Sequence, residues 1–303
     1  MGVRAVFAEP DRRFVERWVW ASVVANAVIV LTGGLVRLTG SGLGCPTWPR
    51  CTDESFVPHS SLGVYGVIEF SNRLLTYVLI AVAVATLVAV WRWSQSTRAM
   101  RVLAVLMAAG IPFQGIIGGI TVLTDLNPWI VSLHLILSLV LIMLSVRLLT
   151  WVRTTPHDPA PATARWLSWL TFALMWVVVY LGTVVTGSGP HAGDADSPRN
   201  GLDPELWSHL HGDSVVALIA LTVATWFILR RTAPRAAKVA AVVIGIELAQ
   251  GLIGIVQYLT DLPIALVAAH LVGASVMVAA GTWLLLTVHA GSRSPSDSVA
   301  VGR

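Results

Sequence analysis

Apolar residues occur along the chain in long runs that carry no charge. The uncharged runs are residues 18–36, 74–91, 102–124, 126–146, 166–193, 214–229 and 262–292, and an eighth, at about 239–260, is interrupted only by Glu247. A helix of about 20 apolar residues crosses the hydrocarbon core of a bilayer. The pattern therefore predicts an all-α integral membrane protein with eight transmembrane helices. The second helix is expected to begin near Leu62 and the sixth near Leu206, with polar residues in their first turns.

The composition agrees with a chain that crosses the lipid bilayer several times. Hydrophobic residues make up 55% of the sequence and charged residues 12%, whereas soluble domains are roughly 25% charged. These values exclude a soluble enzyme, a disordered protein and a collagen-like repeat. The net charge of +4 comes from 20 basic residues that lie between apolar runs. This distribution is typical of membrane topology, and we expect no nucleic-acid partner.

Basic residues are distributed unequally between the two ends of the predicted helices. Of the 20, only Arg37, Arg50, Arg73 and Arg199 lie on the side opposite the N-terminus. The positive-inside rule then places both termini in the cytoplasm of a cell with the chain in its plasma membrane. The loop with Cys45 and Cys51, the only two cysteines, is expected on the extracytoplasmic side, where a disulfide is favoured. Such a bridge could be a structural staple or a labile, redox-active pair.

The two halves of the sequence resemble each other. QGIIGGITVLTDL at 114–126 recurs as QGLIGIVQYLTDL at 250–262, and the same offset of 136 residues relates His134 to His270. We interpret this as a duplication of a four-helix-bundle repeat, with one repeat in residues 1–160 and the other in 161–303. Each repeat has an even number of helices, so the two are predicted to be parallel.

Several ionisable residues fall within the predicted spans, where burial in lipid is costly and function is the first hypothesis. His134 and His270 lie about two turns into the fourth and eighth helices, and His211 lies in the first turns of the sixth. A histidine there can bind a neighbouring helix or ligate iron. A pair formed by His211 and His270 would suit a bis-histidine heme. His209 is two residues from His211 and points away from it on a helix.

Glu69 is the only acidic residue within the spans of the first half. It shares a helix face with Asn72, three residues later, and with Arg73, four residues later. A carboxylate at this place is either a working group or the partner of Arg73 in an ion pair. Glu247 lies near the middle of the seventh helix and has no acidic counterpart, since Ile111 takes the equivalent position. We assign it no role, although Gln250 is a candidate partner.

These features together resemble the heme A synthase family over nearly the whole chain. The resemblance rests on GGLVRLTGSGLGCPTWPRC after the first helix, IEFSNRLL in the second, the two QGxxG…TDL…H segments and the HxH of the sixth. Members oxidise the C8 methyl group of heme O to the formyl group of heme A, which cytochrome c oxidase assembly requires. The resemblance implies heme O as the substrate, heme O synthase (protoheme farnesyltransferase) as a partner, and water as the source of oxygen.

The resemblance also implies roles for individual residues. In the second half, His211 and His270 would ligate the iron of a heme b cofactor, which relays electrons. In the first half, Glu69 would be catalytic and His134 would bind the iron of the substrate heme. The family's other histidine in this site falls on Asn72, so the sixth position of that iron would be open. Cys45 and Cys51 match the outer-loop disulfide of the family.

Two other functions are compatible with parts of the pattern. A di-heme electron carrier linked to quinone would need four axial histidines, and the matched positions supply three. A transporter of heme or a small molecule would more often show broken helices and charges near the middle of the membrane. The polar residues here gather at the outer ends of the helices, which favours the enzyme.

Overall fold

The computed structural model describes residues 9–153 and 158–290, and within them it confirms the predicted all-α fold. The helices are α1 (Arg12–Leu38), α2 (Gly63–Arg92), α3 (Arg98–Leu123), α4 (Pro128–Val152), α5 (Ala162–Ser188), α6 (Pro204–Thr232), α7 (Pro234–Leu259) and α8 (Ile264–Ala290), with a short 3-10 helix, η2 (Ser60–Leu62), before α2. All eight α-helices are long and apolar enough to cross a membrane. The described residues contain no strand. The chain is therefore a multi-pass membrane protein.

Polar residues and prolines set the ends of several helices. The Asp11 side chain accepts a hydrogen bond from the N–H of Phe14 at the start of α1, and Thr97 caps α3 in the same way. Pro128 and Pro234 occupy first positions of α4 and α7, where the missing N–H is not needed. Helices α2 and α6 begin within two residues of the predicted starts.

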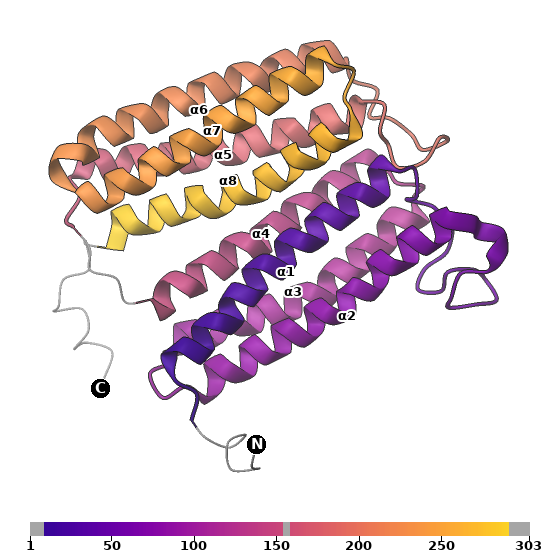
Figure 1. Cartoon of the computed structure of the whole chain (residues 1–303), viewed down its shortest axis with the longest axis horizontal. Helices are drawn as coiled ribbons and strands as arrows, with labels where there is room; N and C mark the ends of the chain where they lie inside the picture. Colours follow the sequence, from indigo (N-terminus) through magenta and orange to yellow (C-terminus); the bar gives the residue numbers. More distant parts are fainter. Residues whose placement is uncertain (1–8, 154–157, 291–303) are drawn as a thin grey trace. The chain divides into compact units, whose positions relative to one another are not determined.

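The first compact unit consists of α1–α4 together with the segment Thr183–Pro204. Helix α1 packs against α2 and α4, and α3 packs against the same two helices, so the four form a closed bundle (Figure 1). Near the start of α1 its core is an apolar cluster that includes the fully buried Val15, Val90 and Leu148. Deeper in the bundle the buried hydroxyls of Ser22 and Thr86 lie 2.8 Å apart. The segment Thr183–Pro204 joins the outer end of this bundle, where the N–H of Gly42 donates to the carbonyl oxygen of Gly193 at 2.8 Å.

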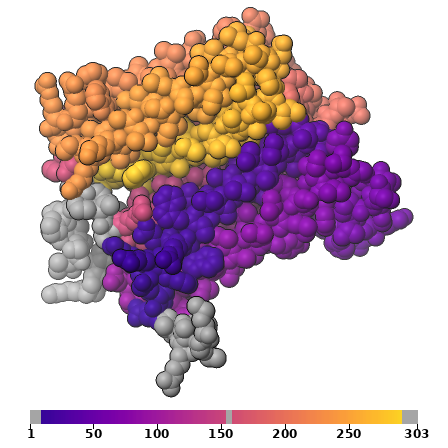
Figure 2. Space-filling view, in the orientation of Figure 1, coloured from indigo at the N-terminus to yellow at the C-terminus, as the bar shows by residue number. Residues whose placement is uncertain are grey.

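The second unit contains α5 up to Gly182 and α6–α8. Helix α7 packs along α8, and polar contacts connect the other neighbours in the bundle. The hydroxyls of Thr171 and Thr225 lie 3.4 Å apart between α5 and α6, and Ser168 lies 3.3 Å from Nε2 of His289 between α5 and α8. Figure 2 shows that side chains fill the spaces between the ribbons of this unit on the visible face.

The outward faces of both bundles are also apolar. Large hydrophobic side chains remain exposed on the helix surfaces, among them Tyr77, Val216, Leu252 and Leu259. In water such faces would be unfavourable, whereas lipid tails are as apolar as they are. Hydrophobicity alone therefore does not separate side chains that pack between helices from those that face lipid. The exposed fraction of each side chain does.

A pair of leucines on α3 tests this distinction. Leu103 is 6% exposed and packs in the core of the first unit, whereas Leu106 is 54% exposed on the same helix. Leu103→Ala should lower the free energy of unfolding by about 2–5 kcal/mol because it leaves a cavity. Leu106→Ala should change it by less than about 0.5 kcal/mol. Thermal unfolding in detergent measures both, and equal losses would contradict this packing.

Candidate functional site

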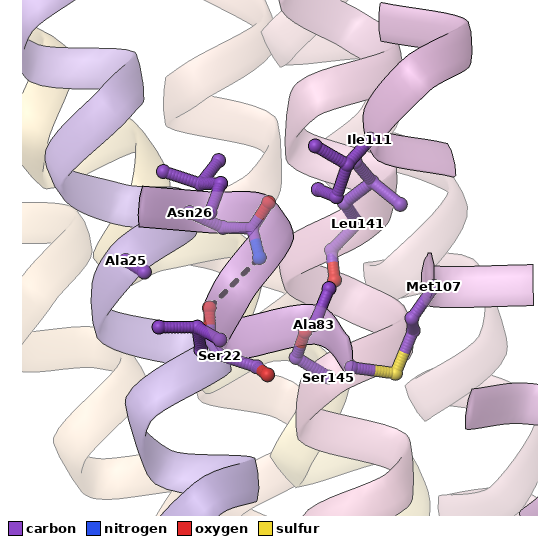
Figure 3. Close-up of a pocket in the computed structure, with 10 residues that line it drawn as sticks. Ser22, Ala25, Asn26, Ala83, Met107, Ile111, Leu141 and Ser145 are labelled. Atoms are coloured by element: carbon purple, nitrogen blue, oxygen red, sulfur yellow. Dashed lines mark hydrogen bonds between the residues drawn. The ribbon is translucent and has the colours of Figure 1, made fainter. Parts of the chain in front are cut away.

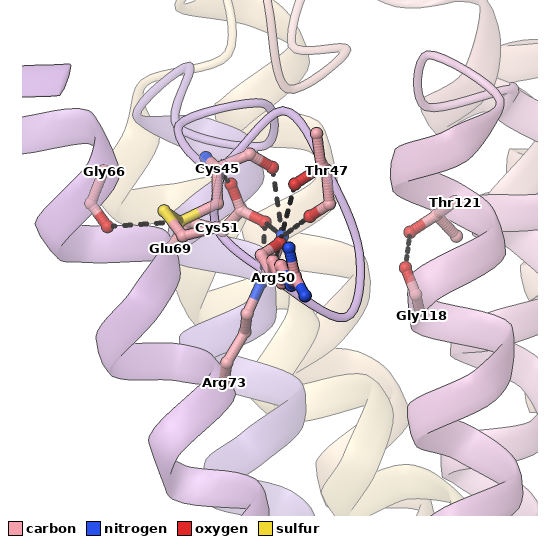
Figure 4. A network of polar contacts seen from close by, with 9 residues as sticks. All are labelled: Cys45, Thr47, Arg50, Cys51, Gly66, Glu69, Arg73, Gly118 and Thr121. Carbon is pink, nitrogen blue, oxygen red and sulfur yellow. Dashed lines mark hydrogen bonds and ion pairs between the residues drawn. A yellow bond between two sulfur atoms is a disulfide. The ribbon is translucent and has the colours of Figure 1, made fainter. Parts of the chain in front are cut away.

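Glu69 lies near the N-terminal end of α2 and is held from two sides (Figure 4). It is 5% exposed. Its Oε1 lies 2.5 Å from Nη2 and 3.1 Å from Nε of Arg73, and its Oε2 accepts a hydrogen bond from the backbone N–H of Cys45. The ion pair expected as the alternative role is thus present in the structure. The second contact fixes the carboxylate against the cysteine loop and was not expected.

Arg73 connects this carboxylate to the rest of the loop. Its guanidinium donates to the carbonyl oxygens of Cys45 and Thr47 at 3.0 Å each and of Arg50 at 3.1 Å. The loop is closed by a disulfide between Cys45 and Cys51. One arginine therefore contacts both the acid and the disulfide-closed loop.

Two adjacent glycines of α3 bring the same loop close to His134. A Cβ atom on Gly119 would lie 2.8 Å from Cε3 of the Trp48 indole, so only glycine lets the indole lie flat on the helix. A Cβ atom on Gly118 would lie 3.3 Å from Cε1 of His134. The indole of the cysteine loop and the imidazole of α4 therefore contact the same turn of α3.

The polar atoms of His134 and Asn72 have unused hydrogen-bonding capacity. Nδ1 of His134 and Oδ1 of Asn72 are buried and have no hydrogen-bond partner among the described residues. The nearby Gln114 donates to the backbone oxygen of His134 at 3.2 Å and to Ser138 at 2.9 Å. Buried orphan atoms are rare in native proteins and indicate a missing partner. The assignment of Asn72 and His134 to one substrate-heme site stays a prediction.

The structure brings His211 and His270 together in the second unit. Their ring centroids are 6.5 Å apart and their planes are inclined by 75°. Nδ1 of His211 lies 3.1 Å from the carbonyl oxygen of Val178, so it can donate there and leave Nε2 as a ligand. Nδ1 of His270 is buried without a partner among the described residues.

Glycines make room for these imidazoles as they do for His134. A Cβ atom would lie 3.2 Å from Cε1 of His211 if added to Gly182, and 3.5 Å from Cε1 of His270 if added to Gly254. Gly254 and Gly118 are separated by 136 residues, the offset that relates the two histidines. The close contact of a glycine with an imidazole thus recurs at the same offset in both halves of the sequence.

The spacing of the two rings fits a heme between them. Two imidazoles on opposite sides of one metal ion, each with a bond of about 2 Å, have centroids roughly 6 Å apart. No group of three or more His, Cys, Asp or Glu side chains in the described residues could hold a bare metal ion. The spacing of the two imidazoles is compatible with the predicted ligation of one heme iron by His211 and His270, and that assignment stays a prediction.

His209 is directed away from this pair. Its side chain is exposed, its Nε2 lies 3.9 Å from Oε1 of Glu205, and its ring contacts that of Tyr258. This agrees with the helical geometry, in which residues two apart face different directions. His209 therefore provides a natural control for His211.

Glu247 and Ile111 occupy equivalent positions in the two repeats but have different surroundings. Glu247 is buried, and its Oε1 accepts a hydrogen bond from Thr222 at 2.7 Å. This partner is on α6, and no hydrogen bond joins Glu247 to the candidate partner Gln250. Ile111 instead lines a cavity of about 10 Å³ with Ser22 and other side chains (Figure 3). This volume approaches the space of one water molecule.

Of the two groups that hold Glu69 in place, the sequence indicated Arg73 but not the backbone N–H of Cys45. The sequence shows the spacing of Glu69 and Arg73, but the N–H of Cys45 is a backbone donor without a sequence signal. Trp48 was visible between the two cysteines, and its contact with Gly119 depends on how the loop folds back. The adjacent glycines Gly118 and Gly119 were the available signal that something packs closely on α3.

Comparison with known proteins identifies the family. The sequence pattern of the cytochrome oxidase assembly protein family matches residues 16–63 and 63–195, more than half of the chain. A heme A synthase from Staphylococcus epidermidis is 25% identical over 223 residues, which are 67% of this chain and 72% of that protein.

Two other relatives show the same similarity over shorter segments. A heme A synthase from Alkalihalophilus pseudofirmus is 30% identical over 170 residues, or 53% of this chain and 56% of that protein. One from Bacillus mycoides is 31% identical over 133 residues, or 43% of this chain and 41% of that protein. The chain therefore belongs to the cytochrome oxidase assembly protein family, and its expected membership of the heme A synthases, a family of enzymes, is confirmed.

Proposed function

We propose that this chain oxidises the C8 methyl group of heme O to a formyl group and so produces heme A for cytochrome c oxidase. Its family and its relatives support a role in heme A biosynthesis. The observation that carries the specific reaction is the buried carboxylate of Glu69, held at the outer end of the bundle that also contains His134.

The first unit supplies the groups that would bind and orient the substrate. His134 would ligate the iron of heme O, and Asn72 would leave the opposite side of the iron without a strong ligand. The indole of Trp48 would form part of the wall on the side of the cysteine loop. Binding the reactant in one orientation lowers the free-energy barrier of the reaction, because less entropy is lost on the way to the transition state.

Glu69 would act at the methyl group itself. Conversion of a methyl group and a water molecule into an aldehyde releases four protons and four electrons in two hydroxylation steps. A carboxylate can accept a proton or stabilise positive charge that develops on the methyl carbon. Its contacts with Arg73 and with the N–H of Cys45 would keep its oxygens in a fixed position during both steps.

His211 and His270 would hold a heme b in the second unit. When bound, this cofactor supplies a one-electron carrier for the electrons released by the substrate. Heme O synthase would deliver the substrate through the plasma membrane, and the cysteine loop would face the extracytoplasmic side.

The two alternative functions receive less support. A di-heme electron carrier would need an axial ligand where Asn72 stands. A transporter with broken helices is not favoured either, because each of the eight predicted spans is one continuous helix in the described residues.

Glu69→Gln tests the catalytic role. The amide keeps the size of the side chain but cannot accept a proton as a base, and we expect heme A formation to fall about a hundredfold or more. Heme b content should stay near that of the wild type. Pigments extracted from membranes that also contain heme O synthase, normalised to heme b, give the measurement.

Arg73→Gln is the matched control for this variant. It removes the same ion pair but keeps a carboxylate at position 69, which still accepts a hydrogen bond from the N–H of Cys45. If Glu69 serves only as the partner of Arg73, both variants should lose stability and keep similar heme A per folded molecule. Near-normal heme A in Glu69→Gln would remove this residue from the mechanism.

His211→Ala tests the heme b site. The variant should lose the low-spin bis-histidine signal in the reduced-minus-oxidised spectrum, because alanine leaves one axial position without a ligand. His209→Ala, two residues away on the exposed face, should keep this signal. The assignment is wrong if both variants retain the wild-type spectrum.

A further inference from the structure

Three basic residues meet at the outer end of the first unit. Arg37, at the end of α1, donates from Nε to the carbonyl oxygen of His191 at 2.5 Å and from Nη2 to that of Thr186 at 2.8 Å. Arg199 donates from Nη2 to the carbonyl oxygen of Pro190 at 2.8 Å and from Nη1 to that of Ser197 at 2.6 Å. Because Pro190 and His191 are consecutive, the two guanidiniums lie close to the same short stretch of backbone.

The imidazole of His191 lies beside both arginines. The pKa of His191 is lowered by burial and by the positive charges of Arg37 and Arg199. Within the described residues, neither arginine lies within ion-pair distance of a carboxylate. Asp194, in the same segment, instead accepts a hydrogen bond from the N–H of Asp196. A cluster of cations without a counter-charge is unfavourable unless an anion completes it.

Both arginines keep a donor for such an anion. Nη1 of Arg37 and Nε of Arg199 make no hydrogen bond to any described residue. Guanidinium groups bind carboxylates through paired N–H donors, and they do so more effectively than an ammonium group. The chemistry of the cluster therefore matches a carboxylate or another oxyanion.

The cluster lies above the proposed substrate site. The segment that carries it packs on the start of α4, where a Cβ atom on Gly187 would lie 3.2 Å from Cβ of Pro128. His134 follows Pro128 by six residues, which is about 9 Å along a helix. A porphyrin bound through its iron to His134 carries two carboxylates on flexible arms at one edge of the ring, and these can extend toward the outer surface.

We propose that Arg37 and Arg199, supported by the segment around His191, form the site that binds the carboxylate groups of the porphyrin substrate. The proposal rests on the proposed function, because it requires a porphyrin at His134. The anionic headgroup of a lipid has similar chemistry and would be the alternative source of the anion.

A pair of porphyrins that differ only in their carboxylates tests the site. Zinc protoporphyrin IX has two free carboxylates, and its dimethyl ester has none. Binding of each is measured by fluorescence titration of the purified full chain, with its heme b, in neutral detergent. The wild type should bind the diacid more tightly than the ester. Arg199→Gln should weaken binding of the diacid about tenfold, as expected for one lost charged hydrogen bond, and leave the ester unchanged.

Two further variants serve as controls. Arg199→Lys keeps the charge and should restore part of the affinity for the diacid. Arg50→Gln removes another outer guanidinium, which donates to the carbonyl oxygen of Asp53, and should leave both affinities unchanged. Equal affinities of the wild type for diacid and ester would overturn the proposal even if Arg199→Gln failed to fold.

His134→Ala separates this inference from the proposed function. If it abolishes binding of both porphyrins while Arg199→Gln leaves the diacid unaffected, the substrate site stands and the carboxylate site is wrong. If both porphyrins still bind His134→Ala with wild-type affinity, the substrate site itself is wrong. The cluster would instead be assigned to a lipid headgroup by two results together. Added phosphatidylglycerol would displace the diacid, and the wild type would bind the diacid no more tightly than the ester.

Discussion

The structure depends on the need of every polar group within a bilayer to have a partner. Within a helix the backbone N–H and C=O groups bond to one another. The polar groups that still need partners are therefore the side chains and the backbone groups at the helix ends. Here the polar side chains that matter gather at the outer ends of two bundles. Glu69 is satisfied by Arg73 and by the N–H of Cys45. The imidazoles of His134 and His270 each keep a buried Nδ1 that has no hydrogen-bond partner among the described residues.

Glycines determine where such ligands can approach. Gly118, Gly182 and Gly254 each let an imidazole lie against a helix, and Gly119 does the same for the indole of Trp48. Both halves of the chain thus contain an imidazole that lies close to a helix glycine. The two halves differ in the polar residues near these rings. In the second half His270 faces His211, whereas in the first half Asn72 follows Glu69 by three residues.

The sequence predicted the eight helices because length and apolarity are local properties. It also predicted the facing of His211 and His270, because equal depth in neighbouring helices follows from counting residues. It could not show that the cysteine loop returns to Glu69 or that Trp48 reaches Gly119, since a loop path depends on contacts between distant segments. The approach of Arg37 to Arg199 was hidden for the same reason, although both were recognised as outer basic residues.

The most direct test of the proposed reaction is to express the chain with heme O synthase in a bacterium that makes no heme A. Hemes extracted from its membranes are then separated and identified by mass. Heme A should appear together with heme b, and only when the chain is present. Membranes that contain the folded chain with bound heme b and abundant heme O, but no heme A or hydroxylated intermediate, would contradict it.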